Sequence, residues 1–283
     1  VDIAFIEAGM GGLHDSTNLF SPLAVICPSI GLDHQAVLGN THAEIATEKA
    51  GVLKNGASFI YATDRTDVRD VFKQKANEEG SKTYELGKDF TAEGSSHSFD
   101  FIYKEQRLEG IALAMAGQHQ VANASLAIMA SLLLQKDYPK VTPELIKDAL
   151  AHASWLGRTE FLMPNLMIDG AHNNESVKVL IDLLRSEYAD KDIELLFAAI
   201  DTKPIDSMLA QLESVGDLTV TSFEYPNSVK LDKYPVTYKQ VSDFQTWIEE
   251  HVTANDDKLY VITGSLYFIS QVRKWILEQE SAV

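Results

Sequence analysis

Residues 29–54, SIGLDHQAVLGNTHAEIATEKAGVLK, join the end of an apolar stretch to the start of a helix, and this succession indicates an α/β fold. The apolar stretch at 23–30 shows no polar alternation, which is typical of a parallel strand covered on both faces. Thr41 and Glu44 have the spacing of a capping box, so a helix is expected to begin there and to run to about the end of the quoted stretch. His34 is expected to close the strand.

Lys49 is the unusual residue of that helix, because it shares one face with two apolar neighbours. Ile45, Lys49 and Leu53 are spaced four residues apart and therefore lie above one another. A lysine that is partly withdrawn from water holds more free amine, which makes it a candidate nucleophile, carbamate former or phosphate contact. The alternative is a lysine whose stem covers apolar surface while its ammonium group reaches water.

Outside this stretch, strands and helices alternate first, and shorter segments rich in Gly and Ser follow. Strands are predicted at 2–7, 23–30 and 58–63, helices at 66–78, 119–135 and 142–151, and antiparallel hairpins within about 82–115. Further strands are predicted at 166–169, 194–200, 217–223 and 258–264, and a last helix from Leu266 to about Glu278. We therefore expect two α/β domains with a boundary near His152–Trp155.

The composition narrows the class of protein. The 41 acidic and 24 basic residues give a net charge of −17, which argues against a nucleic-acid surface and favours metal ions or a local cationic pocket for any anionic substrate. No apolar run reaches the roughly 20 residues of a membrane span, and the single cysteine, Cys27, agrees with a cytoplasmic protein. The chain starts directly in an apolar stretch and contains no GxxxxGK[ST] sequence, so we expect it to be part of a longer protein.

Three further motifs follow expected strands, where α/β proteins bind their ligands. Glu7 opens the glycine-rich turn EAGMGG, and its carboxylate suits a hard cation such as Mg²⁺. Asp169 and His172 belong to DGAHN, in which Asp169 is a candidate for binding ribose hydroxyls. Ser265 in TGS opens a helix, and helix N-termini bind anions. A plain strand-exit turn and two helix caps explain the same residues without any ligand, and these alternatives stay open.

Taken in order, these strings resemble the folylpolyglutamate synthase/dihydrofolate synthase family of the Mur ligase superfamily. EAGMGGLHDSTN is similar to the family's E-x-G-x-G-G-x-x-D-x-T-N stretch, residues 29–54 to its metal and carbamyl-lysine segment, and GRTEFL, DGAHN and TGSLYF to its later blocks. The resemblance covers nearly the whole chain. It implies the remainder of a Mur-ligase-like P-loop ATPase domain at 1–152, with a β-hairpin insertion at about 82–115, and a smaller Rossmann-like α/β ligase domain at 153–283.

The resemblance also implies a reaction and roles for single residues. The family uses ATP to phosphorylate a carboxylate of folate or dihydropteroate, and the amine of L-glutamate then attacks the acyl phosphate. The implied cofactors are ATP and two Mg²⁺ ions, and a monomer without nucleic-acid or membrane partners is expected. The implied roles are metal binding by Glu7, His34 and a carbamylated Lys49, nucleotide binding by Asn123, Arg158 and Asp169, and catalysis by Lys49 together with His172 and Ser265 near the incoming glutamate.

Departures from the family pattern limit what the resemblance implies. The family's phosphate loop lies upstream of the Glu7 motif and is not found in this chain, so the chain by itself is expected to be inactive. Leu13-His14 stand where the family often has an arginine, and IDTKP replaces an acidic–basic turn, so no role is assigned at either place. Two alternatives stay open, a Mur-type ligase of cell-wall peptides and a noncatalytic nucleotide-binding module.

Overall fold

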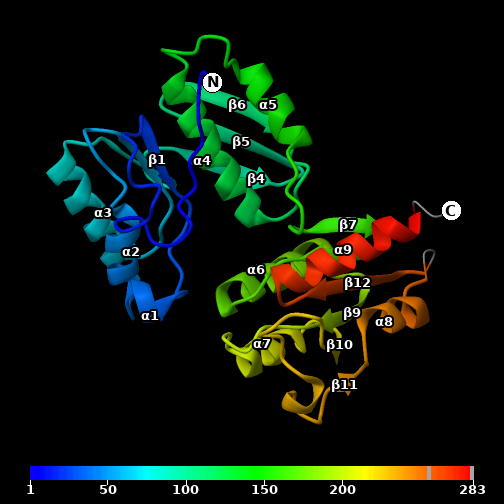
Figure 1. Cartoon of the computed structure of the whole chain (residues 1–283). Coiled ribbons are helices and arrows are strands. Elements are labelled where there is room, and N and C mark those ends of the chain that lie inside the picture. The colour runs from blue at the N-terminus through cyan, green and yellow to red at the C-terminus, as the bar shows by residue number, and fades with distance from the viewer. Residues whose placement is uncertain (254–255, 281–283) are drawn as a thin grey trace. The chain divides into compact units, whose positions relative to one another are not determined.

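The computed structural model describes residues 1–253 and 256–280, and the chain divides into two compact units (Figure 1). The N-terminal unit comprises Val1–Ala114 and Gln118–Ala153, and the C-terminal unit comprises Met115–Gly117 and Ser154–Val283. Each unit has its own sheet and its own apolar core.

The N-terminal unit is built on a three-stranded parallel sheet in the order β1-β2-β3. Successive residues of β2 enter opposite cores, since Phe59 and Tyr61 pack with α2 and α3 while Ile60 packs with α4. Helices therefore cover both faces, which explains why the strands are apolar throughout. The elements are β1 (Ala24–Cys27), α1 (Gln35–Leu38), α2 (His42–Ala50), β2 (Ser58–Tyr61), α3 (Thr66–Glu79), β3 (Thr83–Glu85) and α4 (Gln118–Leu134).

The predicted hairpins of this unit are present as an antiparallel three-stranded sheet. Its strands are β4 (Thr91–Ser95), β5 (Ser98–Tyr103) and β6 (Gln106–Ile111), and α5 (Pro143–His152) follows α4. Phe99 and Phe101 of β5 pack into the same core as α4. Neither α4 nor any other helix in the described ranges combines the length and the apolar character that crossing a bilayer requires.

Two predictions for this unit are wrong. Residues 2–7 form no strand, and Phe5 is 87% exposed, because no described strand offers them a ladder of backbone partners. The strand before His34 ends early, at Cys27, because Pro28 has no N–H to continue the ladder with β2. His34 instead lies in a left-handed turn, with φ of 54°, at the start of α1.

The C-terminal unit contains a six-stranded sheet in the order β11-β10-β9-β12-β8-β7 (Figure 1). Its strands are parallel except for the edge strand β7, and the strands predicted in this half are all present. Helices α6 and α7 pack on one face and α8 and α9 on the other, as a Rossmann-like fold requires. The elements are β7 (Glu160–Met163), β8 (Leu166–Asp169), α6 (Asn174–Glu187), β9 (Asp192–Phe197), α7 (Ile205–Leu212), β10 (Asp217–Val220), the 3₁₀ turn η1 (Leu231–Lys233), β11 (Lys239–Gln240), α8 (Phe244–His251), β12 (Lys258–Thr263) and α9 (Leu266–Glu280).

Candidate functional site

In the C-terminal unit, the ends of two neighbouring strands bring the predicted motifs DGAHN and TGS together. Strands β8 and β12 are paired in parallel, and their last residues, Asp169 and Thr263, stand opposite each other. The backbone N–H of Gly264 donates to the carbonyl oxygen of Ala171 at 3.0 Å, and the hydroxyl of Thr263 donates to the same oxygen at 3.3 Å. Hydrogen bonds thus join the two motifs at the carboxyl ends of β8 and β12.

Asp169 is 8% exposed, and both of its carboxylate oxygens accept backbone hydrogen bonds. One oxygen accepts from the N–H of Thr159 and the other from the N–H of Ala171, each at 2.9 Å. Burial raises the pKa of the Asp169 carboxyl, while these two hydrogen bonds and the nearby charges of Arg158 and His172 act in the opposite direction. The carboxylate therefore joins the GRTEFL segment to the DGAHN turn.

The GRTEFL segment, residues 157–162, contains a strained turn that several hydrogen bonds hold in place. Thr159 has φ of 43°, a left-handed conformation that costs a residue with a side chain about 1–2 kcal/mol and is rare for a β-branched one. The N–H of Gly157 donates to Glu160 at 2.7 Å, and the other carboxylate oxygen of Glu160 accepts from Nε of Arg273 at 2.8 Å. The guanidinium group of Arg158 is half-buried and makes no hydrogen bond or ion pair within the described ranges.

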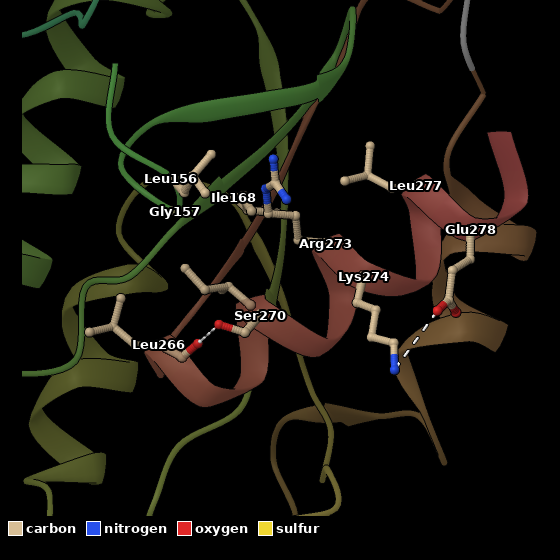
Figure 2. Close-up of a pocket in the computed structure, with 10 residues that line it drawn as sticks. Leu156, Gly157, Ile168, Leu266, Ser270, Arg273, Lys274, Leu277 and Glu278 are labelled. Atoms are coloured by element: carbon tan, nitrogen blue, oxygen red, sulfur yellow. Dashed lines mark hydrogen bonds and ion pairs between the residues drawn. The ribbon is translucent and has the colours of Figure 1, made fainter. Parts of the chain in front are cut away.

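An apolar cavity of about 480 Å³ lies beside this turn, between α9 and the segment that contains Leu156 and Gly157. Figure 2 shows Arg273 projecting from α9 toward Leu156 and Ile168, and the cavity continues to Leu277. None of the predicted site residues lines it. Its lining includes Gly157, Ile168 and Leu266, which are the chain neighbours of Arg158, Asp169 and Ser265.

The starts of α6 and α9 supply the two remaining candidates of this unit. His172 is half-buried, and its backbone N–H donates to the hydroxyl of Ser176 at 3.0 Å. Its ring Nδ1 lies 2.8 Å from the carbonyl oxygen of Gly170. Because a carbonyl oxygen only accepts, Nδ1 is the donor of this hydrogen bond. Asn173 caps α6 in a capping box with Ser176, which agrees with the helix-cap alternative for the DGAHN motif. Ser265 is 2% exposed and accepts a hydrogen bond from the N–H of Tyr267 at 3.2 Å, which confirms that it caps α9.

The candidates of the N-terminal unit are more open to solvent. Glu7 and His34 are exposed, while Lys49 is half-buried on α2 between the fully buried Ile45 and Leu53. The predicted capping box of Thr41 and Glu44 at the start of α2 is confirmed. Burial raises the pKa of the Cys27 thiol to about 11, and the positive charge of nearby Lys49 opposes that rise. No hydrogen bond or ion pair links Glu7, His34 and Lys49 to one another among the residues that the structure describes.

A loop at residues 9–18 contacts the end of α2 that carries Lys49, and its polar residues were not singled out from the sequence. One oxygen of Asp15 accepts from the N–H of Met10 at 3.0 Å, and the other accepts from the hydroxyl and the N–H of Thr17 at 2.6 and 2.9 Å. The hydroxyl of Thr17, followed by these N–H groups, lowers the pKa of Asp15 to about 2. The Asp-x-Thr pattern is typical of a loop that bonds to itself, and it was the signal available in the sequence.

Asn18 and two glycines complete this contact between loop and helix. The Asn18 amide donates to the carbonyl oxygens of Leu13 at 2.9 Å and Gly51 at 3.3 Å. A Cβ atom on Gly12 would lie 2.7 Å from the carbonyl oxygen of Lys49, so only glycine allows the loop to come this close. The motif that contains Glu7 therefore packs directly on the backbone of Lys49.

Asn123, the remaining candidate, is exposed on α4. Its amide donates to the side-chain oxygen of Gln120 at 3.2 Å, one turn earlier on the same helix. This local bond fixes the direction of the amide and leaves its oxygen available as an acceptor.

The residues present suit one kind of magnesium site only. In the described part of the chain, no group of three or more His, Cys, Asp or Glu side chains is arranged to hold a metal ion. Glu7 and His34 offer one carboxylate and one imidazole, and Lys49 offers oxygen ligands only when carbamylated. Mg²⁺ is commonly held by one or two carboxylates together with substrate phosphates. This donor set fits Mg²⁺ bound along with a nucleotide, and it does not fit a metal cage made by the protein alone.

Comparison with known proteins identifies the family. Residues 1–131 match the model of the Mur ligase middle domain. The dihydrofolate synthase/folylpolyglutamate synthase of Bacillus subtilis (strain 168) is 33% identical over 292 aligned residues, which cover 97% of this chain and 67% of that protein. The chain belongs to the dihydrofolate synthase/folylpolyglutamate synthase family. The resemblance inferred from the motifs is thereby confirmed.

Two further relatives support membership of this family of ATP-dependent ligases. The folylpolyglutamate synthase of Lacticaseibacillus casei is 30% identical over 296 aligned residues, covering 99% of this chain and 68% of that protein. A solved structure described as an FPGS–AMPPCP–folate complex is 26% identical, with a TM-score of 0.81 over 96% of this chain and 65% of that chain. These likenesses confirm the Mur-ligase-like α/β architecture. The chain spans about two thirds of the length of these relatives.

Proposed function

We propose that the protein containing this chain is an ATP-dependent ligase that joins L-glutamate to a folate or to dihydropteroate. The observation that carries the proposal is the 33% identity to the Bacillus subtilis relative over 97% of the chain. The solved complex with AMPPCP, an analogue of ATP, and folate supports both substrate classes. Phosphoryl transfer from ATP to the folate carboxylate releases ADP, and attack by the glutamate amine forms the amide and releases phosphate.

Side chains of the C-terminal unit suit the handling of negative charge in this reaction. The guanidinium of Arg158, which has no hydrogen bond or ion pair among the described residues, is a donor for phosphate or carboxylate oxygens. Helices α6 and α9 begin directly after Asn173 and Ser265, so their N-termini provide favourable ends for the carboxylates of the incoming glutamate. In this proposal His172 and Ser265 orient the glutamate, and Asn123 contacts the nucleotide.

Residues of the N-terminal unit suit the metal-dependent part of the reaction. Glu7 and His34 would contribute ligands to Mg²⁺ bound with ATP, and a carbamate on Lys49 would contribute to a second ion. Bound Mg²⁺ would neutralise charge on the phosphates. The contribution of the chain itself is to hold Lys49 at the end of α2, where the loop at 9–18 fixes the backbone around it.

Replacement of Lys49 tests this proposal. In the complete protein, Lys49→Ala is expected to lower the rate of glutamate-dependent ADP release by about 100-fold or more, since a catalytic group that is missing or displaced has effects of this size. The measurement is kcat at saturating ATP, folate and glutamate. Lys73→Ala is the matched control, because Lys73 is exposed on α3 and its side chain makes no hydrogen bond or ion pair among the described residues. Near-normal turnover of Lys49→Ala without an added carboxylate would contradict the role of Lys49.

The choice of substrate is tested by competition. A ligase of cell-wall peptides is not favoured, because the relatives are synthases of folates. We expect dihydropteroate or a reduced folate, and not a UDP-sugar peptide, to support ADP release when both are offered. The opposite preference would move the protein to the peptide-ligase class. A cytoplasmic location and a monomeric state remain predictions, which fractionation of the source cells and sedimentation would test.

A further inference from the structure

Two stacked tyrosines stand beside Ser265 at the start of α9. The rings of Tyr225 and Tyr267 have centroids 4.1 Å apart, with an angle of 18° between their planes. The backbone N–H of Tyr267 donates to the hydroxyl of Ser265, so this ring belongs to the first turn of α9. Tyr267 is 50% exposed. Ligands of open α/β sheets bind beyond the carboxyl ends of the strands, and the tyrosine pair lies there, where β12 ends and α9 begins.

The loop that carries Tyr225 is fixed to its surroundings. Gln271 of α9 donates through Nε2 to the carbonyl oxygen of Glu224 at 2.9 Å. Phe223 is 6% exposed, and its ring stacks on that of Tyr225 with centroids 6.0 Å apart. The N–H of Ser228 donates to the carbonyl oxygen of Tyr225 at 3.0 Å and closes a turn. The pair is therefore positioned before any ligand arrives, which lowers the entropic cost of binding.

The phenol hydroxyls of the pair retain one proton for a ligand. They are hydrogen-bonded to each other, and this bond raises the pKa of Tyr225. A phenol hydroxyl donates only one hydrogen bond, so two bonded hydroxyls use one proton and keep the other. Neither hydroxyl bonds to a further residue in the part of the chain that the structure describes. A hydroxyl whose oxygen already accepts a hydrogen bond is also a stronger donor, and the more exposed Tyr267 is the one that presents it.

The chemistry of this end of the sheet suits a dicarboxylate. In the proposed function the start of α9, with Ser265, is a place for one carboxylate of the incoming glutamate. Only three carbon atoms separate the two carboxylates of glutamate, so a donor for the second must lie close to the first. Tyr267 stands two residues after Ser265 and meets this requirement. Since the chain has a net charge of −17, an anionic substrate depends on such local donors.

We propose that Tyr267, supported by Tyr225, donates a hydrogen bond to the side-chain carboxylate of the incoming amino acid and thereby selects L-glutamate. The inference rests on the proposed function and deepens it, because it assigns recognition of the second carboxylate to a residue that no motif singled out. A hydroxyl bound to a carboxylate makes a charge-assisted hydrogen bond. The uncharged amide of L-glutamine, on a side chain of the same length, gains less from the same hydroxyl.

The kinetics of amino-acid selection test this assignment. In the complete protein, kcat/KM is measured for L-glutamate and for L-glutamine at saturating ATP and folate, with ADP release as the readout. Tyr267→Phe keeps the ring and removes the hydroxyl, so kcat/KM for L-glutamate is expected to fall about 10- to 100-fold, the range of a hydrogen bond to a charged group. The value for L-glutamine is expected to change less than about twofold. Equal losses for the two amino acids would contradict the proposal.

Two further variants separate the supporting hydroxyl from a general effect of losing one. Tyr225→Phe leaves the O–H of Tyr267 in place and removes the group that strengthens it, so kcat/KM for L-glutamate is expected to fall about two- to fivefold. A larger loss in Tyr225→Phe than in Tyr267→Phe would overturn the assignment of Tyr267. Tyr238→Phe is the matched control, because its hydroxyl donates to Glu213 at 3.4 Å, in the connection between α7 and the start of β10.

A spectroscopic measurement keeps this inference distinct from the proposed function. In protein labelled with ¹³C at Cζ of tyrosine, the resonance of Tyr267 is assigned with Tyr267→Phe. In the presence of AMPPCP and folate, L-glutamate is expected to shift this resonance more than L-glutamine does, and to leave that of Tyr238 unchanged. An unchanged Tyr267 resonance at saturating L-glutamate would contradict the inference even if the enzyme is active. A wild-type protein without glutamate-dependent ADP release would contradict the proposed function and leave the resonance as the test of the tyrosine.

Discussion

The two units hold their candidate residues in contrasting ways. In the C-terminal unit Asp169 and Ser265 are buried, and each is fixed by hydrogen bonds to backbone N–H groups. In the N-terminal unit Glu7 and His34 are exposed, whereas the backbone of Lys49 is packed against Gly12. A prebuilt site orients its groups before any ligand arrives, whereas exposed ligands of a metal become ordered only when the metal and phosphates bind. The contrast predicts different responses to substitution.

The largest effect is expected where the packed loop of the N-terminal unit meets Lys49. Gly12→Ala would place a methyl group 2.7 Å from the carbonyl oxygen of Lys49 and 2.8 Å from that of Glu48. Because these are backbone atoms, loop and helix must separate, at a cost of about 1–3 kcal/mol in the free energy of unfolding. We also expect ligation to fall about 100-fold, since Lys49 moves with its backbone.

Gly9→Ala is the matched control for this substitution. Its added Cβ would lie 3.5 Å from the nearest oxygen of Asp15, which is an ordinary contact. Urea denaturation and kcat are measured for both variants. If Gly12→Ala behaves like Gly9→Ala, the loop does not support Lys49, and the N-terminal unit has no rigid part of its candidate site.

Removal of the Asn18 amide is expected to lower the stability of the N-terminal unit by a smaller amount. Asn18→Ala removes the hydrogen bonds to the carbonyls of Leu13 and Gly51, each worth about 0.5–1.5 kcal/mol. We expect a loss of about 1–2 kcal/mol in the free energy of unfolding. Asn77→Ala is the control, because Asn77 is exposed on α3. Equal stability of the two variants would show that the amide does not join the loop to α2.

Particular residues show what the sequence was able to predict. Thr41 with Glu44 at the start of α2 and Ser265 at the start of α9 act within one turn of their own helices, so local patterns identified these caps correctly. The parallel strands of the C-terminal unit followed from their apolar runs. The run at 2–7 has the same composition, but a strand also needs a neighbour, and apolar character does not supply one.

Local sequence patterns did not predict the tertiary contacts of the candidate site. Glu160 pairs with Arg273, which lies 113 residues further along the chain, and no spacing rule connects them. The left-handed conformation of Thr159 contradicts the preference of a β-branched residue, and its N–H donates to Asp169, ten residues further along the chain. The close approach of Gly12 to Lys49 likewise depends on how the loop and α2 pack. The sequence therefore identified the candidate residues, and tertiary contacts determine which of them are held in place.

The smallest effect, and the one that contrasts the units most directly, is the response to acid. The pKa of Asp15 in the folded protein is lowered to about 2, so its hydrogen bonds stabilise the fold above the ordinary pKa of 3.8 and are lost as the pH falls toward 2. Burial raises the pKa of Asp169, so the folded state takes up a proton there more readily than the unfolded chain, and acid favours the fold at this position. The thermal midpoint between pH 6 and pH 2 should fall less steeply in Asp15→Asn than in the wild type, and more steeply in Asp169→Asn. If the thermal midpoints of the wild type and both variants fall by the same amount with pH, the pKa values of Asp15 and Asp169 are not shifted in opposite directions.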